Sequence, residues 1–239
     1  MIKKTLNQNA KYVQELINSI EPDFVFSNKP INRFKVIESN NNKLEKNKTD
    51  QLFKLKKKID SIENCNLKNN SKNLVLGDGN INSPIMLIGE APGEDEDNSG
   101  LSFQGEIGDL LNKMLLAINI ERKNVYTTYT INFKLPEDRK PTSQEIKHYS
   151  VYLKEHISII NPKIIILMGS TAMEALTGIN IKISNERGKW KEIILKNKTF
   201  PLMITFSPSY LLRYPDKKRY SWEDLKKLKQ KILDLNIRI

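Results

Sequence analysis

The chain has 239 residues, of which 38% are hydrophobic, enough for one large domain with its own core. The 39 Lys and Arg outnumber the 28 Asp and Glu, which gives a formal charge of +11. This surplus indicates an anionic partner, nucleic acid before a membrane surface, although a lysine-rich composition bias is the plainer alternative. The single cysteine, Cys65, excludes a disulfide framework, and no stretch approaches the ~20 apolar residues of a membrane span. With no secretory signal at the N-terminus, we expect a cytoplasmic protein without a membrane segment.

The first part of the chain differs in composition from the rest. Apolar residues at helical spacing predict a helix over residues 6–20, and a second short helix is predicted from about Asp50 to Ile62. Residues 21–50 are polar and are typical of a linker. We therefore expect residues 1–62 to form an N-terminal helical appendage with a polar linker, and residues 63–239 to form an α/β domain.

In this second part, strand and helix patterns alternate, with a short Gly77–Gly79 turn before the first strand. Such alternation predicts a three-layer α/β/α domain with a central, mainly parallel four-stranded sheet. The predicted strands are 85–88, 125–131, 163–168 and 202–206, and the predicted helices are 106–118, 142–160, 171–178 and 221–239. Pairs of capping residues predict where three helices begin: Thr142 with Glu145, Thr171 with Glu174, and Ser221 with Asp224.

Two polar segments follow strand patterns, where open α/β sheets place their ligands. In residues 89–97 a Gly-Glu pair and a Pro-Gly turn precede four acidic residues, which either hold a divalent cation or are solvated. Phe103 follows between glycines and could stack on a base or pack into the core. Residues 206–219 combine hydroxyls, leucines, aromatics and cations, which could wedge into a base stack and hold phosphates. In the plainer interpretation these leucines belong to the core and the cations are solvated.

The usual phosphate-binding glycine motifs are missing from the sequence. His148 and His156 lie eight residues apart and could share a helix face, but two ligands do not make a metal site. We expect no metal and a structural or surface role for both histidines.

The two polar segments together resemble the two motifs of family 4 uracil-DNA glycosylases, the iron–sulfur type. The resemblance covers about residues 62–236. It implies a monomeric base-excision repair enzyme that flips deoxyuridine out of single- or double-stranded DNA and hydrolyses the N-glycosidic bond. A catalytically weakened or inactive DNA-binding homologue and a metal-dependent nucleic-acid hydrolase are the alternatives. The matching segments are 89–97 with 100–105, 207–215 with 222–225, and the spacers 125–141 and 162–169.

The resemblance implies roles for individual residues. The family's second motif begins with a histidine that donates to uracil O2, and this position is Ser207, whose uncharged hydroxyl should stabilise the oxyanion less. Tyr129 stands where the family reads the uracil edge with an asparagine, and Asn132 lies at an odd offset that faces the other side of the strand. The implied catalytic residues are Glu90, Glu96 and Ser207; the base-binding residues are Gly89, Ala91, Phe103 and Tyr129; the DNA contacts are Ser209, Leu211, Leu212, Arg213, Lys217 and Lys218.

The family holds its iron–sulfur cluster with four cysteines. The matching positions here are Ile62, Cys65, Phe133 and Tyr149. One thiolate cannot hold a cluster. We therefore predict that this chain has no cofactor, and that the two aromatic side chains fill the vacated volume.

Overall fold

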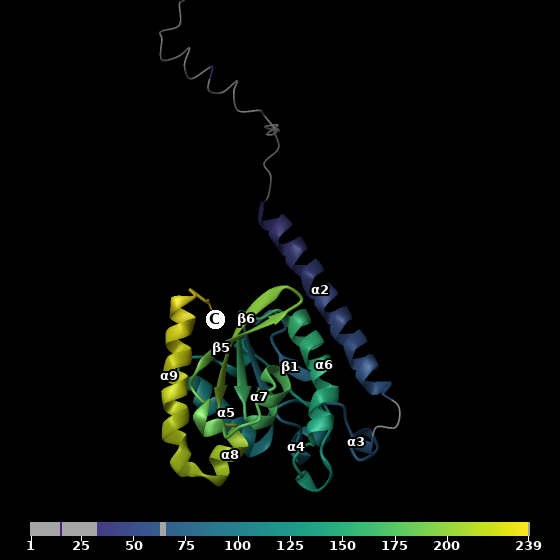
Figure 1. Ribbon diagram of the computed structural model, residues 1–239. Helices are drawn as coiled ribbons and strands as arrows, with labels where there is room; N and C mark the ends of the chain where they lie inside the picture. Colours follow the sequence, from purple (N-terminus) through teal and green to yellow (C-terminus); the bar gives the residue numbers. More distant parts are fainter. Residues whose placement is uncertain (1–14, 16–32, 63–65, 239) are drawn as a thin grey trace, which may run out of the picture. The chain divides into compact units, whose positions relative to one another are not determined.

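Six strands form one sheet in the order β1-β3-β2-β4-β6-β5 (Figure 1). The four inner strands are parallel, whereas β1 and β5 pair antiparallel at the edges. The predicted α/β fold with a mainly parallel sheet is therefore confirmed, but the sheet has six strands and not four. The strands are β1 (Gly77–Gly79), β2 (Ile85–Gly89), β3 (Tyr126–Tyr129), β4 (Ile164–Met168), β5 (Trp190–Leu195) and β6 (Lys198–Thr205).

The two edge strands escaped prediction for different reasons. β1 is Gly-Asp-Gly, which has no hydrophobic pattern, and a Cβ on Gly77 would lie 2.6 Å from the carbonyl oxygen of Thr127. Glycine thus lets β1 pair with β3 where the sequence indicates only a turn. β5 has no fully buried residue and forms a hairpin with β6, so its weak alternation is that of a half-exposed edge strand.

This structure is a computed structural model that describes residues 15, 33–62 and 66–238. Within these ranges, side chains are described for residue 15 and from residue 45 onward. The chain divides into one unit of residues 1–41 and a compact unit of residues 42–239. The helix predicted over residues 6–20 lies outside the described residues, apart from residue 15. None of the helices in the described ranges is both long and apolar enough to cross a lipid bilayer.

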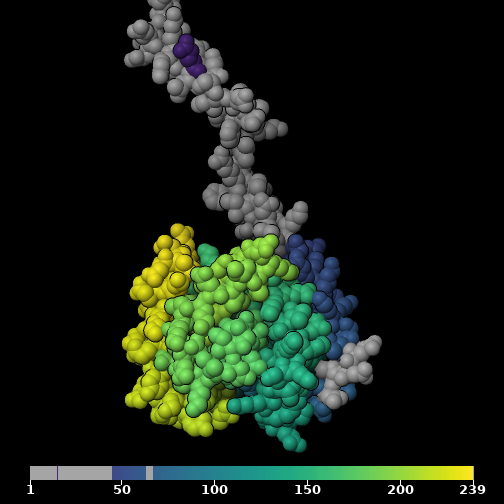
Figure 2. Space-filling view, viewed as in Figure 1, coloured from purple at the N-terminus to yellow at the C-terminus, as the bar shows by residue number. Residues whose placement is uncertain are grey.

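Side chains of the buried strands alternate between two cores, one on each face of the sheet. In β2, Met86 and Ile88 belong to one core, and Ile85 and Leu87 to the other. The first core is covered by α6 (Ser143–Ile160) and α7 (Ser170–Thr177) and the second by α5 (Gly105–Leu116) and α9 (Lys218–Asp234), which confirms the three layers (Figure 1). In Figure 2 the segment that includes β5, in light green, lies between α9 in yellow and α6 in teal. The other helices described are α2 (Arg33–Asp60), α3 (Asn66–Asn69), α4 (Glu94–Ser99) and α8 (Pro208–Arg213). Short 3₁₀ turns lie at Arg122–Asn124, Pro136–Asp138, Ile183–Asn185 and Pro215–Lys217.

Helix α2 (Arg33–Asp60) begins well before the predicted start at Asp50, within the segment interpreted as a linker. Its apolar residues Leu52, Leu55 and Ile59 join the core under α6. The Lys48 ammonium group donates hydrogen bonds to the carbonyl oxygens of Ile81 (3.0 Å) and Ile160 (2.9 Å). Because of these contacts, residues 42–62 belong to the compact unit, which extends from residue 42 to residue 239. The prediction placed the boundary at residue 63, because the polar sequence before it gives no sign of these contacts.

The predicted helix caps have different outcomes. Thr142 and Glu145 form the expected reciprocal capping box at the start of α6. Helix α7 begins at Ser170 after Gly169, so Thr171 lies inside the helix and is not its cap. Helix α9 begins at Lys218, so Ser221 and Asp224 are not its caps either.

Asp224 is instead a buried anchor between α9 and the sheet. Its Oδ2 accepts hydrogen bonds from Thr205 Oγ1 (2.8 Å) and from Arg187 Nε (3.0 Å). Ser221 and Asp224 thus have the spacing of a capping pair, but Asp224 forms an ion pair with Arg187, which is distant in sequence.

His156 of α6 is buried, with 2% of its surface exposed, and so has the structural role expected for it. Its Nε2 lies 3.0 Å from the Tyr126 hydroxyl and its Nδ1 lies 3.5 Å from Thr128 Oγ1. Burial lowers the pKa of His156 to about 3.

Acid should therefore destabilise the protein through His156. The unfolded histidine has a pKa of about 6.5, so below that pH the unfolded chain binds a proton that the folded chain excludes. The free energy of unfolding should fall by about 2 kcal/mol between pH 7 and pH 5, and the loss should continue towards pH 3. Urea unfolding at each pH measures this slope. His156→Gln should flatten it, whereas His148→Gln, on the exposed side of α6, should keep it; an unchanged slope in His156→Gln would contradict the assignment.

Candidate functional site

A pocket of about 360 Å³ lies at the carboxyl ends of β2, β3 and β6. It unites the two polar segments singled out in the sequence, since residues that follow β2 and residues that follow β6 share its wall. The parallel strand order brings them together. Of the predicted site residues, its lining contains Gly89, Glu90, Ala91, Glu96, Phe103, Tyr129, Ser207, Ser209 and Arg213, but not Leu211, Leu212, Lys217 or Lys218.

The acidic residues after Gly93 form helix α4 and not the predicted loop. Carboxylates are favourable in the first turn of a helix because they face its unpaired N–H groups. The helix also separates them: Glu96 and Asp97 are buried, whereas Glu94 and Asp95 are exposed. Asp97 accepts hydrogen bonds from the backbone N–H groups of Lys72 and Asn73, and Glu94 forms ion pairs with Lys134 and Lys72. The carboxylates of α4 are therefore directed to different partners and do not converge on one point.

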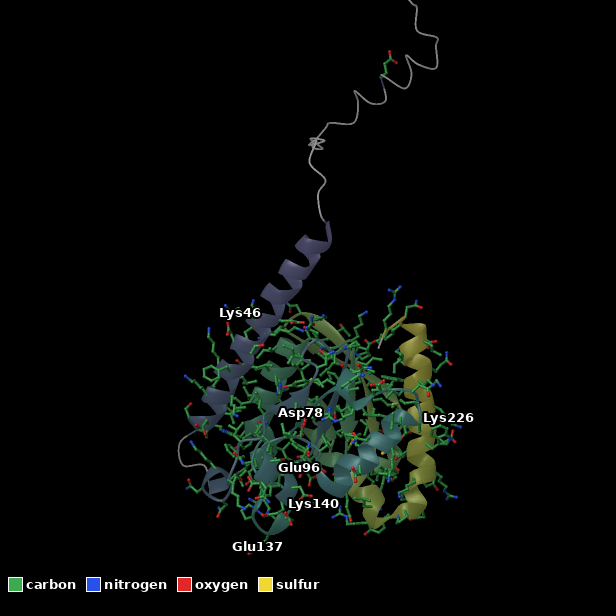
Figure 3. The ribbon with its side chains drawn as sticks, turned by 180° about the vertical axis from the view of Figure 1, so that it is seen from behind. Lys46, Asp78, Glu96, Glu137, Lys140 and Lys226 are labelled. Atoms are coloured by element: carbon green, nitrogen blue, oxygen red, sulfur yellow. The ribbon has the colours of Figure 1, made fainter. Side chains whose placement is uncertain are left out.

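Glu96 is 2% exposed and already has three hydrogen-bond donors. Its Oε2 accepts from the N–H of Gly93 (2.8 Å), and its Oε1 accepts from the N–H of Gln104 (2.9 Å) and from the hydroxyl of Tyr129 (3.1 Å). Figure 3 labels this side chain among those at the lower end of the domain. Glu96 therefore joins the start of α4, the segment before α5 and the end of β3. These contacts hold the carboxylate in place, and the catalytic role of Glu96 stays a prediction.

Of the two implied catalytic carboxylates, Glu90 has fewer partners among the described residues than Glu96. It follows β2 and is half-buried in the pocket wall. Its Oε2 accepts a hydrogen bond from the hydroxyl of Thr171 in α7, and its Oε1 accepts none from the part of the chain that the structure describes. Glu90 is thus oriented by one oxygen and has the other for water or a developing positive charge. Sequence reasoning missed Thr171 as a site residue, because it was interpreted as a helix cap.

Phe103 and Tyr129 form one stacked unit at the inner wall of the pocket. Their ring centroids are 4.8 Å apart, and the planes differ by 27°. The hydroxyl of Tyr129 accepts a hydrogen bond from the N–H of Phe103 (2.9 Å) and donates one to Glu96. Burial, assisted by the negative charge of Glu96, raises the pKa of Tyr129 well above its usual value, so the phenol stays protonated. A Cβ on Gly89 would lie 2.8 Å from either ring, so glycine is needed there.

The second motif forms the short helix α8. Ser207 is its N-cap: its hydroxyl accepts a hydrogen bond from the N–H of Tyr210 (3.2 Å) and lies 3.1 Å from Ser209 Oγ. Leu211 is 1% exposed, so it is a core residue and cannot be the predicted wedge. Leu212 is half-buried and Arg213 exposed, because successive residues of a helix turn by about 100°.

The two lysines beyond α8 lie outside the pocket lining. Lys217 forms an ion pair with Asp216 (2.7 Å), and Lys218, at the start of α9, is exposed. Asn132, as expected, lies away from the pocket, and its amide donates to the carbonyl oxygen of Val75 (3.0 Å).

Three of the four positions matched to the family's cluster ligands lie in or against the core under α6. Phe133 and Tyr149 are buried and pack edge to face, with centroids 6.4 Å apart. Ile62 packs against the same core, and Cys65 is outside the described residues. Within the described ranges, no group of three His, Cys, Asp or Glu side chains is placed to hold a metal ion. The side chains at three of the four positions have no thiol, which is the group that holds an iron–sulfur cluster.

Comparison with known proteins agrees with this geometry. The model of the uracil DNA glycosylase superfamily matches residues 76–229. The chain belongs to this superfamily. Its relatives include the type-4 uracil-DNA glycosylase of Thermotoga maritima, which is 36% identical over 168 residues that cover 69% of this chain and 86% of the relative. That of Sulfurisphaera tokodaii is 35% identical over 189 residues, 76% of this chain and 84% of the relative. A DNA polymerase of Bacillus phage SP01 is 31% identical over 150 residues, 62% of this chain and 16% of that protein.

Membership confirms the resemblance inferred from the two motifs, and these first relatives are named as type-4 uracil-DNA glycosylases. The departures that the resemblance implies fall at Tyr129 and Ser207, which line the pocket, and at the buried residues Phe133 and Tyr149.

Removing the Glu96 carboxylate should destabilise the fold. Glu96→Ala leaves three donors without an acceptor, so the free energy of unfolding should fall by about 3 kcal/mol in urea unfolding. Glu94→Gln is the matched control, because this exposed side chain is only two residues away and its loss should barely change the unfolding midpoint. Equal midpoints for the two variants would show that Glu96 does not hold the three segments together.

Proposed function

We propose that this chain flips deoxyuridine out of DNA and hydrolyses its N-glycosidic bond in the pocket between α4 and α8. The observation that carries the proposal is the Glu90 carboxylate, which Thr171 holds at the pocket wall with one oxygen uncommitted. Flipping is required because the bond cannot be reached inside the base stack.

The chemistry demands two stabilised charges. As the C–N bond breaks, positive charge develops on the sugar and negative charge on uracil O2. The oxygen of water bonds to the sugar carbon, its proton passes to Glu90, and the base leaves as an anion that is then protonated. The Ser207 hydroxyl can donate one neutral hydrogen bond to that anion, which is weaker than a bond from a charged donor. We therefore expect a slow enzyme.

Contacts to the DNA strand are assigned to the rim of the pocket. Arg213 is exposed there, and Lys218 follows five residues later in the chain. The half-buried Leu212 is assigned to apolar contact with the bases. Arginine and lysine neutralise phosphates without reading sequence, so these residues would position a strand of any sequence. The formal charge of +11 supports this assignment.

Two alternatives have less support. A non-catalytic DNA-binding homologue is not favoured by the comparisons, whose first relatives are named as glycosylases. A metal-dependent hydrolase would need the acidic residues of α4 to converge, whereas Glu96 and Asp97 hold backbone N–H groups and Glu94 pairs with Lys134.

We infer that the chain works without the iron–sulfur cluster that the resemblance implies. Support comes from the chemistry of the side chains, since isoleucine, phenylalanine and tyrosine at three positions leave at most one thiolate. The packed Phe133–Tyr149 pair supplies apolar contacts between the segment after β3 and α6, which a cluster would otherwise link. A monomeric, cytoplasmic protein stays a prediction from sequence.

Uracil excision tests the function. The wild type should release uracil from a labelled uracil-containing strand, detected as alkali-sensitive cleavage. Glu90→Gln should reduce the rate about 100-fold while DNA binding is retained, because a positioned carboxylate contributes at least this factor. Glu121→Gln, at an exposed side chain outside the pocket lining, is the control and should keep the wild-type rate. No product at stoichiometric wild type with retained binding would contradict the proposal, and activity only with added Mg²⁺ would favour the metal-dependent alternative.

Iron content tests the cofactor inference. Protein purified under anaerobic conditions should contain iron far below one atom per chain and show no visible absorption band. Phe133→Ala should lower the unfolding temperature without changing the iron content, because it removes packing from the core. Four irons per chain in the wild type would contradict the inference.

A further inference from the structure

We propose that the ring of Tyr129 occupies the place on Phe103 where an extruded base would stack, and so limits base entry and excision. The inference rests on the proposed function, since it concerns the base that this pocket would take. Tyr129 is thus a specificity-determining residue that competes with the substrate for one site.

The first support is the stack itself. Phe103 and Tyr129 are the two aromatic side chains in the lining of the 360 Å³ pocket. Their separation of 4.8 Å and angle of 27° are those of an offset stack, the arrangement a base would adopt on Phe103. Both rings are buried, at 5% and 4% exposure. The face of Phe103 that Tyr129 covers is therefore not open to a base in this structure.

The second support is the polar end of the Tyr129 ring. Its hydroxyl accepts a hydrogen bond from the N–H of Phe103 and donates one to the carboxylate of Glu96. The imide edge of uracil likewise offers a carbonyl acceptor beside an N–H donor. Without the tyrosine, the same N–H group and the same carboxylate would meet that edge. Tyr129 thus satisfies the groups that could otherwise bind a base.

The third support is the backbone around the two rings. Phe103 has a φ of 55°, a left-handed conformation that non-glycine residues rarely adopt. Its N–H is held in that conformation by the hydrogen bond to Tyr129. Gly89 leaves room for both rings, because a Cβ there would lie 2.8 Å from each. The surrounding chain is therefore shaped to hold the stacked pair, and a base must displace Tyr129.

Three variants separate the ring from its hydroxyl. Tyr129→Ala and Tyr129→Asn remove the ring, whereas Tyr129→Phe keeps it and removes the hydroxyl. Binding of free uracil is measured by calorimetry, and excision is measured on the same labelled strand. Thermal unfolding of each variant verifies that it is folded. If Tyr129→Ala does not fold, Tyr129→Asn is used as the variant without the ring.

If the ring occupies the site, wild type and Tyr129→Phe should bind free uracil weakly. Variants without the ring should bind it at least about tenfold more tightly, because the fraction of protein with an open site rises. They should also excise uracil at least about tenfold faster.

Two results would overturn the inference. One is wild type binding free uracil as tightly as a folded variant without the ring. The other is Tyr129→Phe binding as tightly as Tyr129→Ala, which would make the hydroxyl the limiting group and not the ring. Failure of the proposed function has a different result: no variant excises uracil, yet removal of the ring still increases uracil binding.

Discussion

The buried carboxylate of Glu96 is the interaction on which the pocket depends. It accepts hydrogen bonds from Gly93, Gln104 and Tyr129, and these residues come from three separate segments of the chain. A buried charge is tolerated only where donors surround it, so the three segments must meet for the protein to fold this way. The position of Phe103 follows from this arrangement, because its N–H bonds to the hydroxyl that Glu96 orients. The inner wall of the pocket is therefore part of the structural frame.

The outer wall is built differently. Among the residues that the structure describes, the Glu90 carboxylate has one hydrogen-bond partner, Thr171, and Ser207 shares its hydroxyl between the start of α8 and Ser209. These side chains are held but not saturated, which is the condition for acting on a substrate. The pocket thus combines a rigid inner half, closed by a stacked aromatic pair, with an outer half that retains free hydrogen-bonding capacity.

Much of the fold could be predicted from residue patterns, and the errors have identifiable causes. Buried parallel strands such as Ile164–Met168 are apolar throughout, and a local capping box marks the start of α6, so both were predicted. The edge strands and the beginning of α2 were missed, because Gly77–Gly79 and the polar residues from Arg33 onward have no hydrophobic periodicity. Apparent capping pairs at Thr171 and Asp224 were wrong, because a short polar side chain has the same local signature whether its partner is near or distant in sequence.

For this protein, residue patterns were enough to predict the α/β class, the superfamily and most of the predicted residues that meet at the pocket, because motifs and strand periodicity are local properties of the chain. The contacts that each residue makes there were set by the tertiary structure. It turned Leu211 into the core, committed Glu96 to three donors, left Glu90 with a free oxygen and placed the ring of Tyr129 on Phe103. These outcomes depend on burial and on partners distant in sequence, and residue type and spacing do not encode either of them.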